Sequence, residues 1–242
     1  MTPLDRPRDV GELLRDALTV YLRHFWTFLA LAAVVVVPAE LIVSGVGLEM
    51  LTSDFDSTTS LAEEAAPGAV SYLVVAPLIT AFCVFALTSI AGGGSPGARE
   101  AIVKGFESFT PIFFAVLLAA LGIVLGLILI VPGIYLFVRW FFVPQVVVLE
   151  QTHQADALRS SSRLVQGAWW RTAGVVLLVT ALTFLVSVVV ASPFAAAARS
   201  TDHAVWALAG QTLAAVVAQP FASLCWTLLY FDLRARKRAA HT

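Results

Sequence analysis

Long apolar runs alternate with short polar stretches along most of the chain. Crossing about 30 Å of hydrocarbon as a helix takes roughly 20 mostly apolar residues. Five runs are long enough, at residues 25–46, 70–91, 112–131, 172–191 and 204–231. A sixth run, 134–149, is shorter and carries Arg139. The pattern predicts an all-α polytopic membrane protein with six transmembrane helices.

Only Pro132 and Gly133 separate the third of these runs from the short one that follows it. Proline interrupts the helical hydrogen-bond ladder and glycine permits a sharp reversal. The alternative, one kinked helix over residues 112–149, would be about 57 Å long at 1.5 Å per residue, which is too long for one crossing. We therefore expect two spans joined by a hairpin at Pro132-Gly133.

The basic residues decide the orientation of these spans. With six spans and the N-terminus inside, thirteen of the fifteen lysines and arginines fall in inner segments. The first outer segment, 47–69, holds acidic residues and no basic one. Because inner loops of membrane proteins carry the excess of lysine and arginine, both termini are predicted to be cytoplasmic.

Three stretches near the spans have the 3.6-residue period of amphipathic helices, at residues 9–23, 95–109 and 156–170. The second follows a Ser95 N-cap with Pro96 at the first helical position. Helices of this kind lie in the membrane interface with the apolar face down. Each stretch precedes two spans, so the chain is interpreted as one integral membrane domain, 1–242, with repeat units 9–91, 95–149 and 154–231. Each unit is an interfacial helix and a hairpin of two spans; chance self-similarity of apolar sequence is the alternative.

Composition removes several other classes of protein. Of the 242 residues 59% are hydrophobic and 13% are charged, against about 25% charged in soluble domains. A net charge of −1 gives no basic field for nucleic acid. Cys83 and Cys225 lie in apolar runs, which predicts two buried, inert thiols rather than a disulfide framework.

The motif scan finds no catalytic constellation. Residues 92–97 match two glycine-rich signatures, but they follow a membrane span, and Pro96 after Ser95 has no N–H for an oxyanion hole. Glu150 and His153 have the i, i+3 spacing of di-iron proteins, which need a second such pair and two further glutamates. We therefore predict no catalytic, cofactor-binding or metal-binding residues, and no cofactor.

Two charged residues fall within the predicted spans. Glu40 lies six residues before the end of the first run, and Arg139 lies six residues after Gly133. At 1.5 Å per residue both are about 9 Å below the outer boundary. Since a charge in hydrocarbon is costly unless paired, the sequence predicts an intramembrane ion pair between Glu40 and Arg139. Separate snorkelling of the arginine to the interface is the alternative.

Small and basic residues suggest two further contacts. Gly122 and Gly126 form a GxxxG pattern, and an alanine ridge continues in the last span, which favours close helix packing. Four basic residues follow the last span directly, and each is expected to gain about 1 kcal/mol near anionic lipid. They are Arg234, Arg236, Lys237 and Arg238.

Three stretches, read in order, resemble one known family. They are residues 132–139, then 149–170 with Glu150, Ser160 and two tryptophans, and last 229–234, Leu-Tyr-Phe-Asp-Leu-Arg. This order is similar to the membrane domain fused to some bacterial glycerophosphodiester phosphodiesterases, which also occurs alone. In fused members the chemistry belongs to a separate TIM barrel, for which this chain has no residues left. The resemblance therefore implies a non-enzymatic module of a bacterial cytoplasmic membrane.

Two functional hypotheses remain from the sequence. The first is a non-catalytic membrane module in the lipid bilayer that binds either lipid, with anionic lipids as candidates, or another membrane protein, and no nucleic acid. The second is a transporter or permease component with an intramembrane polar site, suggested by Glu40, Arg139, Gln211 and Gln219 within spans. A polar cavity reaching the midplane would favour transport, and a closed bundle with a lateral groove would favour the module.

Overall fold

Helices make up every regular element of the described chain. The computed structural model describes residues 4–43, 68–94, 97–152, 154–201 and 203–240. The elements are α1 (Val10–Arg23), α2 (Phe25–Val43), the π-helical turn η1 (Ser71–Val75), α4 (Ala76–Ala91), α5 (Ala98–Glu107), α6 (Phe109–Leu127), α7 (Val131–Arg139), α8 (Val143–Glu150), α9 (Gln154–Val165), α10 (Trp169–Thr201) and α11 (Ala204–Ala239). Six stretches within the described residues are long and apolar enough to cross a membrane. The all-α class and the six spans of the sequence prediction are confirmed at this level.

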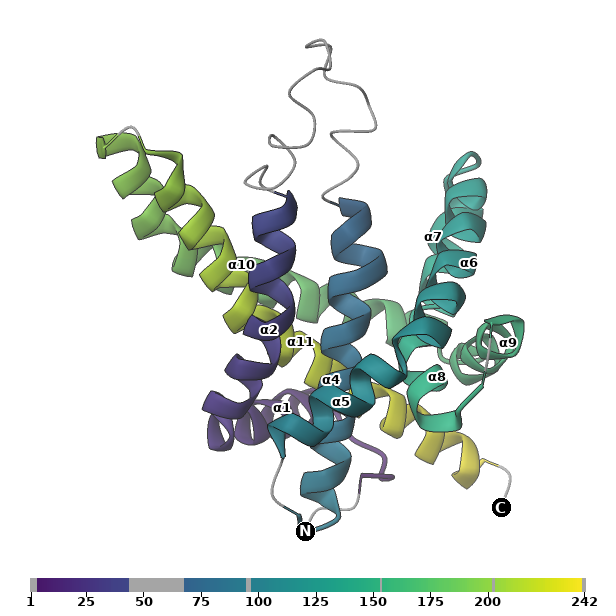
Figure 1. The fold of residues 1–242 in the computed structure, drawn as a ribbon. Helices are drawn as coiled ribbons and strands as arrows, with labels where there is room; N and C mark the ends of the chain where they lie inside the picture. The colour runs from purple at the N-terminus through teal and green to yellow at the C-terminus, as the bar shows by residue number, and fades with distance from the viewer. Residues whose placement is uncertain (1–3, 44–67, 95–96, 153, 202, 241–242) are drawn as a thin grey trace.

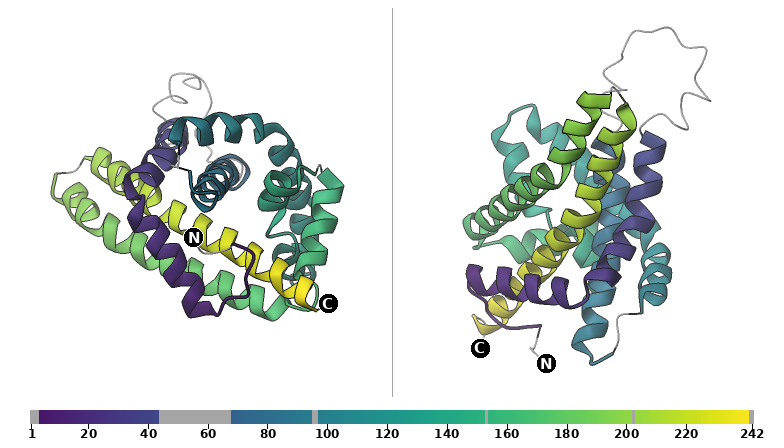
Figure 2. Two further views of the ribbon diagram at one scale, coloured as in Figure 1. Left: turned by 90° about the horizontal axis from the view of Figure 1, so that it is seen from below. Right: turned by 90° about the vertical axis from the view of Figure 1, so that its left-hand side faces the viewer.

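The long helix α11 lies at the centre of the bundle. It packs against α10 along much of its length, and also against α2, α4 and α1. Figure 1 shows both ends of the chain at the same end of the bundle, which we call the terminal end. The core around α4 and α11 is apolar, with Phe28, Phe82 and Leu224 fully buried. Helices α10 and α11 have 33 and 36 residues, about 50 and 54 Å, and they run obliquely to α2 and α4 (Figures 1 and 2).

The reversal between α6 and α7 comes earlier than the sequence predicts. Residues 128–130 make the turn, and Ile130 adopts the positive φ of 55° there. Pro132 instead stands in the first turn of α7, where its missing N–H costs no hydrogen bond. A Cβ added to Gly133 would lie 2.6 Å from Leu127 atoms, so the glycine is needed for close packing rather than for the turn.

The predicted span 134–149 is two helices rather than one. Helix α7 ends at Arg139 and α8 begins at Val143, with Pro144 in its first turn. The chain therefore changes direction between them. A depth counted from the hairpin tip at 1.5 Å per residue therefore holds only as far as Arg139, where α7 ends.

The GxxxG pattern of α6 is used within the chain. A Cβ added to Gly122 would lie 2.4 Å from the Trp140 ring, and one added to Gly126 would lie 3.0 Å from the Gly133 backbone. Both glycines therefore face the α7 side of the hairpin. The pattern serves packing inside one molecule, as small residues do between membrane helices.

Helix α1 packs part of its apolar surface on the protein. In α1, which begins with a capping box between Asp9 and Glu12, the buried residues Leu13, Ala17 and Tyr21 form one stripe. The Tyr21 hydroxyl donates to the Val217 carbonyl of α11 at 2.9 Å. Leu18 and Leu22 of the same helix are exposed. Only part of the apolar face of α1 is therefore available to anything outside the protein. The predicted cap Ser95 and Pro96 lie outside the described residues.

Candidate functional site

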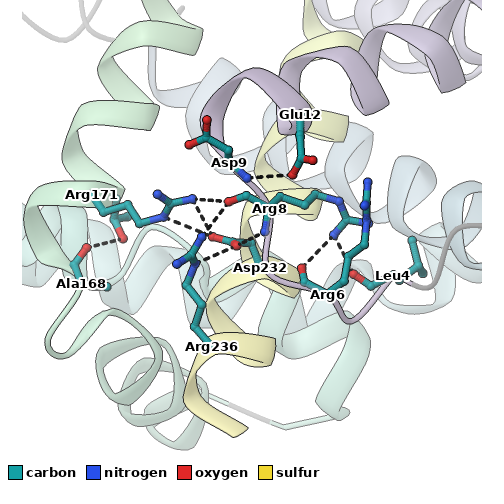
Figure 3. A network of polar contacts seen from close by, with 10 residues as sticks. Leu4, Arg6, Arg8, Asp9, Glu12, Ala168, Arg171, Asp232 and Arg236 are labelled. Atoms are coloured by element: carbon teal, nitrogen blue, oxygen red, sulfur yellow. Dashed lines mark hydrogen bonds and ion pairs between the residues drawn. The ribbon is translucent and has the colours of Figure 1, made fainter. Parts of the chain in front are cut away.

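A buried carboxylate organises the terminal end of the bundle. Asp232 on α11 is fully buried, and Figure 3 shows three segments converging on it. Its Oδ1 accepts from the Arg8 backbone N–H at 2.7 Å and from Arg236 Nε at 2.9 Å. Its Oδ2 accepts from Arg171 Nε at 3.2 Å and from Arg171 Nη2 at 3.1 Å. The Arg8 carbonyl in turn accepts from both guanidinium groups at 2.7 Å each. Asp232 thus joins α10, α11 and the N-terminal segment.

The Arg8 side chain is itself buried and extends this network to α1. Its Nε lies 3.0 Å from Asp16 Oδ2, and Arg6 Nη2 lies 2.8 Å from the same oxygen. Arg8 Nη1 donates to the Leu4 carbonyl at 2.7 Å, a contact drawn in Figure 3. Partial burial raises the pKa of the Asp16 carboxyl, but the hydrogen bonds from the two arginines outweigh it, so that the net pKa shift is downward. The N-terminal segment is therefore held by charge-assisted contacts.

Asp5, a carboxylate of the N-terminal segment, neutralises part of the C-terminal basic cluster. Asp5 Oδ2 lies 2.7 Å from Arg238 Nη1 and 3.2 Å from Arg234 Nη2. Both arginines project from α11 one turn apart, which brings their guanidinium groups to the same carboxylate. The pairs are partly exposed, with Asp5 about one third exposed, so they contribute little to stability.

Beside these pairs lies a cavity of about 660 Å³ with a cationic lining. Four basic residues line it, one from α9 and three from α11: Arg163, Arg234, Lys237 and Arg238. Ser160 and Leu164 of α9 complete that wall. Its one acidic residue, Glu150, accepts a hydrogen bond from the Tyr230 hydroxyl at 2.7 Å. The Lys237 ammonium donates to the Arg163 carbonyl and so joins α9 to α11. The arrangement can bind an anion with several oxygen acceptors.

Three of the four C-terminal basic residues singled out in the sequence line this cavity. The fourth, Arg236, turns away from it toward Asp232. Sequence reasoning missed Arg163 and the buried Asp232. The i, i+4 spacing of Asp232 and Arg236 was a visible signal for their pairing, but nothing local to α9 marks Arg163.

The structure does not bring Glu40 and Arg139 together. Among the described residues neither takes part in an ion pair. Arg139 instead donates to the Tyr135 hydroxyl at 3.3 Å and stacks over its ring, 5.3 Å from the centroid. Its carbonyl accepts from Ser161 of α9 at 2.8 Å. Glu40 is close to the end of α2 at Val43, and Figure 1 shows α2 on the other side of α4 from α7. The residue count estimated depth alone and did not give the positions of α2 and α7 around the bundle.

The remaining residues with candidate chemistry are the possible metal ligands and the two cysteines. In the part of the chain that the structure describes, no three His, Cys, Asp or Glu side chains gather as a metal site would require. Cys83 and Cys225 are buried free thiols, as predicted. His153, the predicted neighbour of Glu150, lies outside the described residues.

The fold and composition define a multi-pass helical membrane protein. The family described as the membrane domain of glycerophosphoryl diester phosphodiesterase matches residues 111–231, which is half of the chain. The chain belongs to this family, and the sequence resemblance is confirmed. The match spans α6 to α10 and most of α11, ending one residue before Asp232. Comparison with curated proteins and with solved structures gave no significant match.

Proposed function

We propose that this protein is a non-catalytic membrane module that binds the phosphate headgroup of an anionic lipid at its terminal end. The observation that carries the proposal is the cavity between α9 and α11, where four basic side chains face one carboxylate. Among the described residues, the Arg163 guanidinium has no protein partner. A phosphate presents several acceptor oxygens to such a cluster, and arginine binds it in bidentate geometry.

The position of the tryptophans supports a membrane surface at this level. Trp26 is the second residue of α2, and Trp170 is the second residue of α10, next to the Arg171 that contacts Asp232. Their side chains are 78% and 83% exposed. Exposed indole rings next to membrane spans favour the headgroup region. Together with the excess of basic residues in the predicted inner segments, the exposed tryptophans support an inner-membrane protein with both termini in the cytoplasm. They also support three hairpins whose leading helices α1, α5 and α9 lie near the cytoplasmic surface.

Topology is directly testable with single cysteines in the Cys83→Ala/Cys225→Ala background. Cysteines at Lys104 and Arg159 should react with a membrane-impermeant maleimide only after the cell is permeabilised. A cysteine at Asp56 should react in intact cells, because the segment 47–69 is expected outside. Labelling of position 159 from the outside alone would contradict six spans with cytoplasmic termini.

Headgroup binding is testable with the double variant Arg163→Gln/Lys237→Gln. Each basic group near an anionic surface contributes about 1 kcal/mol, or roughly fivefold in affinity, so the pair should weaken binding about 25-fold. The measurement is the dissociation constant for fluorescent phosphatidylglycerol, with the protein in zwitterionic detergent micelles. The matched control is Arg159→Gln on the same helix, whose arginine is 72% exposed and lies outside the cavity.

A variant of opposite sign sharpens this test. Asp5→Asn removes the carboxylate that neutralises Arg234 and Arg238, so phosphatidylglycerol should bind more tightly. Equal affinity of the wild-type protein, the double variant and Asp5→Asn would contradict the proposal.

The transport alternative receives less support. Gln211 and Gln219 line one groove, but neither Glu40 nor Arg139 lines it. The intramembrane polar residues named by the sequence therefore do not converge on one site, and the grooves beside α10 and α11 favour a binding module.

A further inference from the structure

A groove of about 600 Å³ lies between α10 and α11, away from the terminal cavity. Its walls are mostly apolar, with Phe184, Val188 and several alanines. Six further residues carry polar groups: Thr180, Thr183, Ser187, Gln211, Gln219 and Trp226. Among the residues that the structure describes, no charged side chain lines the groove. Figures 1 and 2 show α10 and α11 side by side as they run obliquely away from the terminal end.

Several of these polar groups have no partner in the protein. The side-chain amides of Gln211 and Gln219 make no hydrogen bond with any described residue. Trp226 Nε1 is buried and also unpartnered, although its ring packs edge-on against Phe141 with centroids 5.1 Å apart. Thr183, by contrast, satisfies itself by donating to the Val179 carbonyl at 2.9 Å. All of them lie in helices long and apolar enough to span a membrane, and in hydrocarbon an unpaired polar group is costly because no bulk water replaces the missing partner.

The spacing of the unpartnered groups sets the shape of a ligand. Gln219 and Trp226 are seven residues apart, two helical turns, so both face the same side of α11 about 10 Å from each other. Gln211 lies a further two turns toward the start of α11. A ligand that satisfies them must be elongated, with acceptor oxygens separated along its length.

The chemistry of the groove lining sets the class of the ligand. The indole N–H only donates, whereas amides and hydroxyls both donate and accept. Because no charge lines the groove, an ionised headgroup would find no counter-charge there. We propose that the groove binds an uncharged glycerolipid of the diacylglycerol class, whose ester carbonyls accept from Trp226 and Gln219 and whose chains lie on the alanines and Phe184. This proposal is independent of the cationic cavity at the terminal end.

The experiment uses the full-length protein in nanodiscs of zwitterionic lipid with a diacylglycerol that carries a photoreactive diazirine in one acyl chain. Crosslinked peptides should map to residues 180–191 and 211–226. Unlabelled dioleoylglycerol should compete for crosslinking, and phosphatidylglycerol should not. Competition by both lipids to the same extent would overturn the proposal, and this arm needs no variant.

A variant pair tests the named groups. Gln219→Leu/Trp226→Phe removes the amide and the indole N–H while keeping the apolar surface, and it should lower crosslinking at least fivefold. Trp206→Phe, an exposed tryptophan on α11 outside the groove, should leave crosslinking unchanged. Undiminished crosslinking in the double variant would contradict the proposal. Reaction of a cysteine at Ala215 with a membrane-impermeant maleimide would also overturn it, because the groove would then be a water-filled path. Loss of phosphatidylglycerol binding at the terminal cavity would not affect either result.

Discussion

The substitution Asp232→Asn is expected to lower the free energy of unfolding by about 3–5 kcal/mol, the usual cost of removing one partner from a buried ion pair. Asp232 is fully buried and is the common counter-charge of Arg171 and Arg236. Asparagine keeps one acceptor oxygen but no charge, so two guanidinium groups lose their carboxylate. The Arg8 backbone N–H must then compete for the remaining acceptor, and the N-terminal segment should loosen.

The measurement is reversible unfolding in mixed detergent micelles, with amide hydrogen exchange of residues 4–9 as a local readout. Asp156→Asn is the matched control, since its pair with Arg159 is 3.5 Å long and both side chains are more than 70% exposed. Exposed pairs contribute 1 kcal/mol or less, so this control should stay within about 1 kcal/mol of the wild type. A loss of the same small size for Asp232→Asn would show that the buried carboxylate is not the centre of the network.

The second large effect is expected from Gly122→Ala, which adds a single methyl group. Its Cβ would lie 2.4 and 2.7 Å from two atoms of the Trp140 ring. That ring cannot move freely, because Trp140 Nε1 donates to Ser162 of α9 at 3.1 Å. Overpacking of this kind costs about 1–3 kcal/mol, and we expect the upper end of the range because α6 and α7 would have to separate.

The same substitution elsewhere provides the control. Gly174 lies inside α10, and an added Cβ would meet nothing within 4 Å. Gly174→Ala should therefore be neutral or stabilise the protein by up to about 1 kcal/mol through helix propensity. If the GxxxG pattern served dimerisation instead, Gly122→Ala would change the oligomeric state in cross-linking experiments and leave monomer stability unchanged.

Several features of the site were visible in the sequence, and others were not. The basic cluster after the last span was visible in the sequence, because lysine and arginine beside an apolar run are a local signal. Arg163 and Asp232 were missed as site residues, since their roles depend on partners on other helices. The contact between Arg8 and Asp232 joins residues 224 positions apart, and the contact between Arg171 and Asp232 joins residues 61 positions apart.

The ion pair predicted between Glu40 and Arg139 shows the same limit. Counting residues estimates depth along a straight span, but it says nothing about position around the bundle. The count from Gly133 to Arg139 lies within α7, but the packing of α7 beside α9 gave Arg139 other partners. Lateral placement is a property of side-chain packing between helices.

The sequence by itself determined the class of protein, the number of spans and the family. Hydropathy is a sum over neighbouring residues, and a membrane helix satisfies its own backbone hydrogen bonds, so each span can be predicted without knowledge of the others. The tertiary structure alone decided which charges meet at Asp232, which basic residues share the cavity beside α9, and which polar groups of α10 and α11 are left without partners. These features depend on contacts between segments far apart in the chain. Such contacts form only when the helices pack together in three dimensions, so the residues that take part cannot be identified from their neighbours in the sequence.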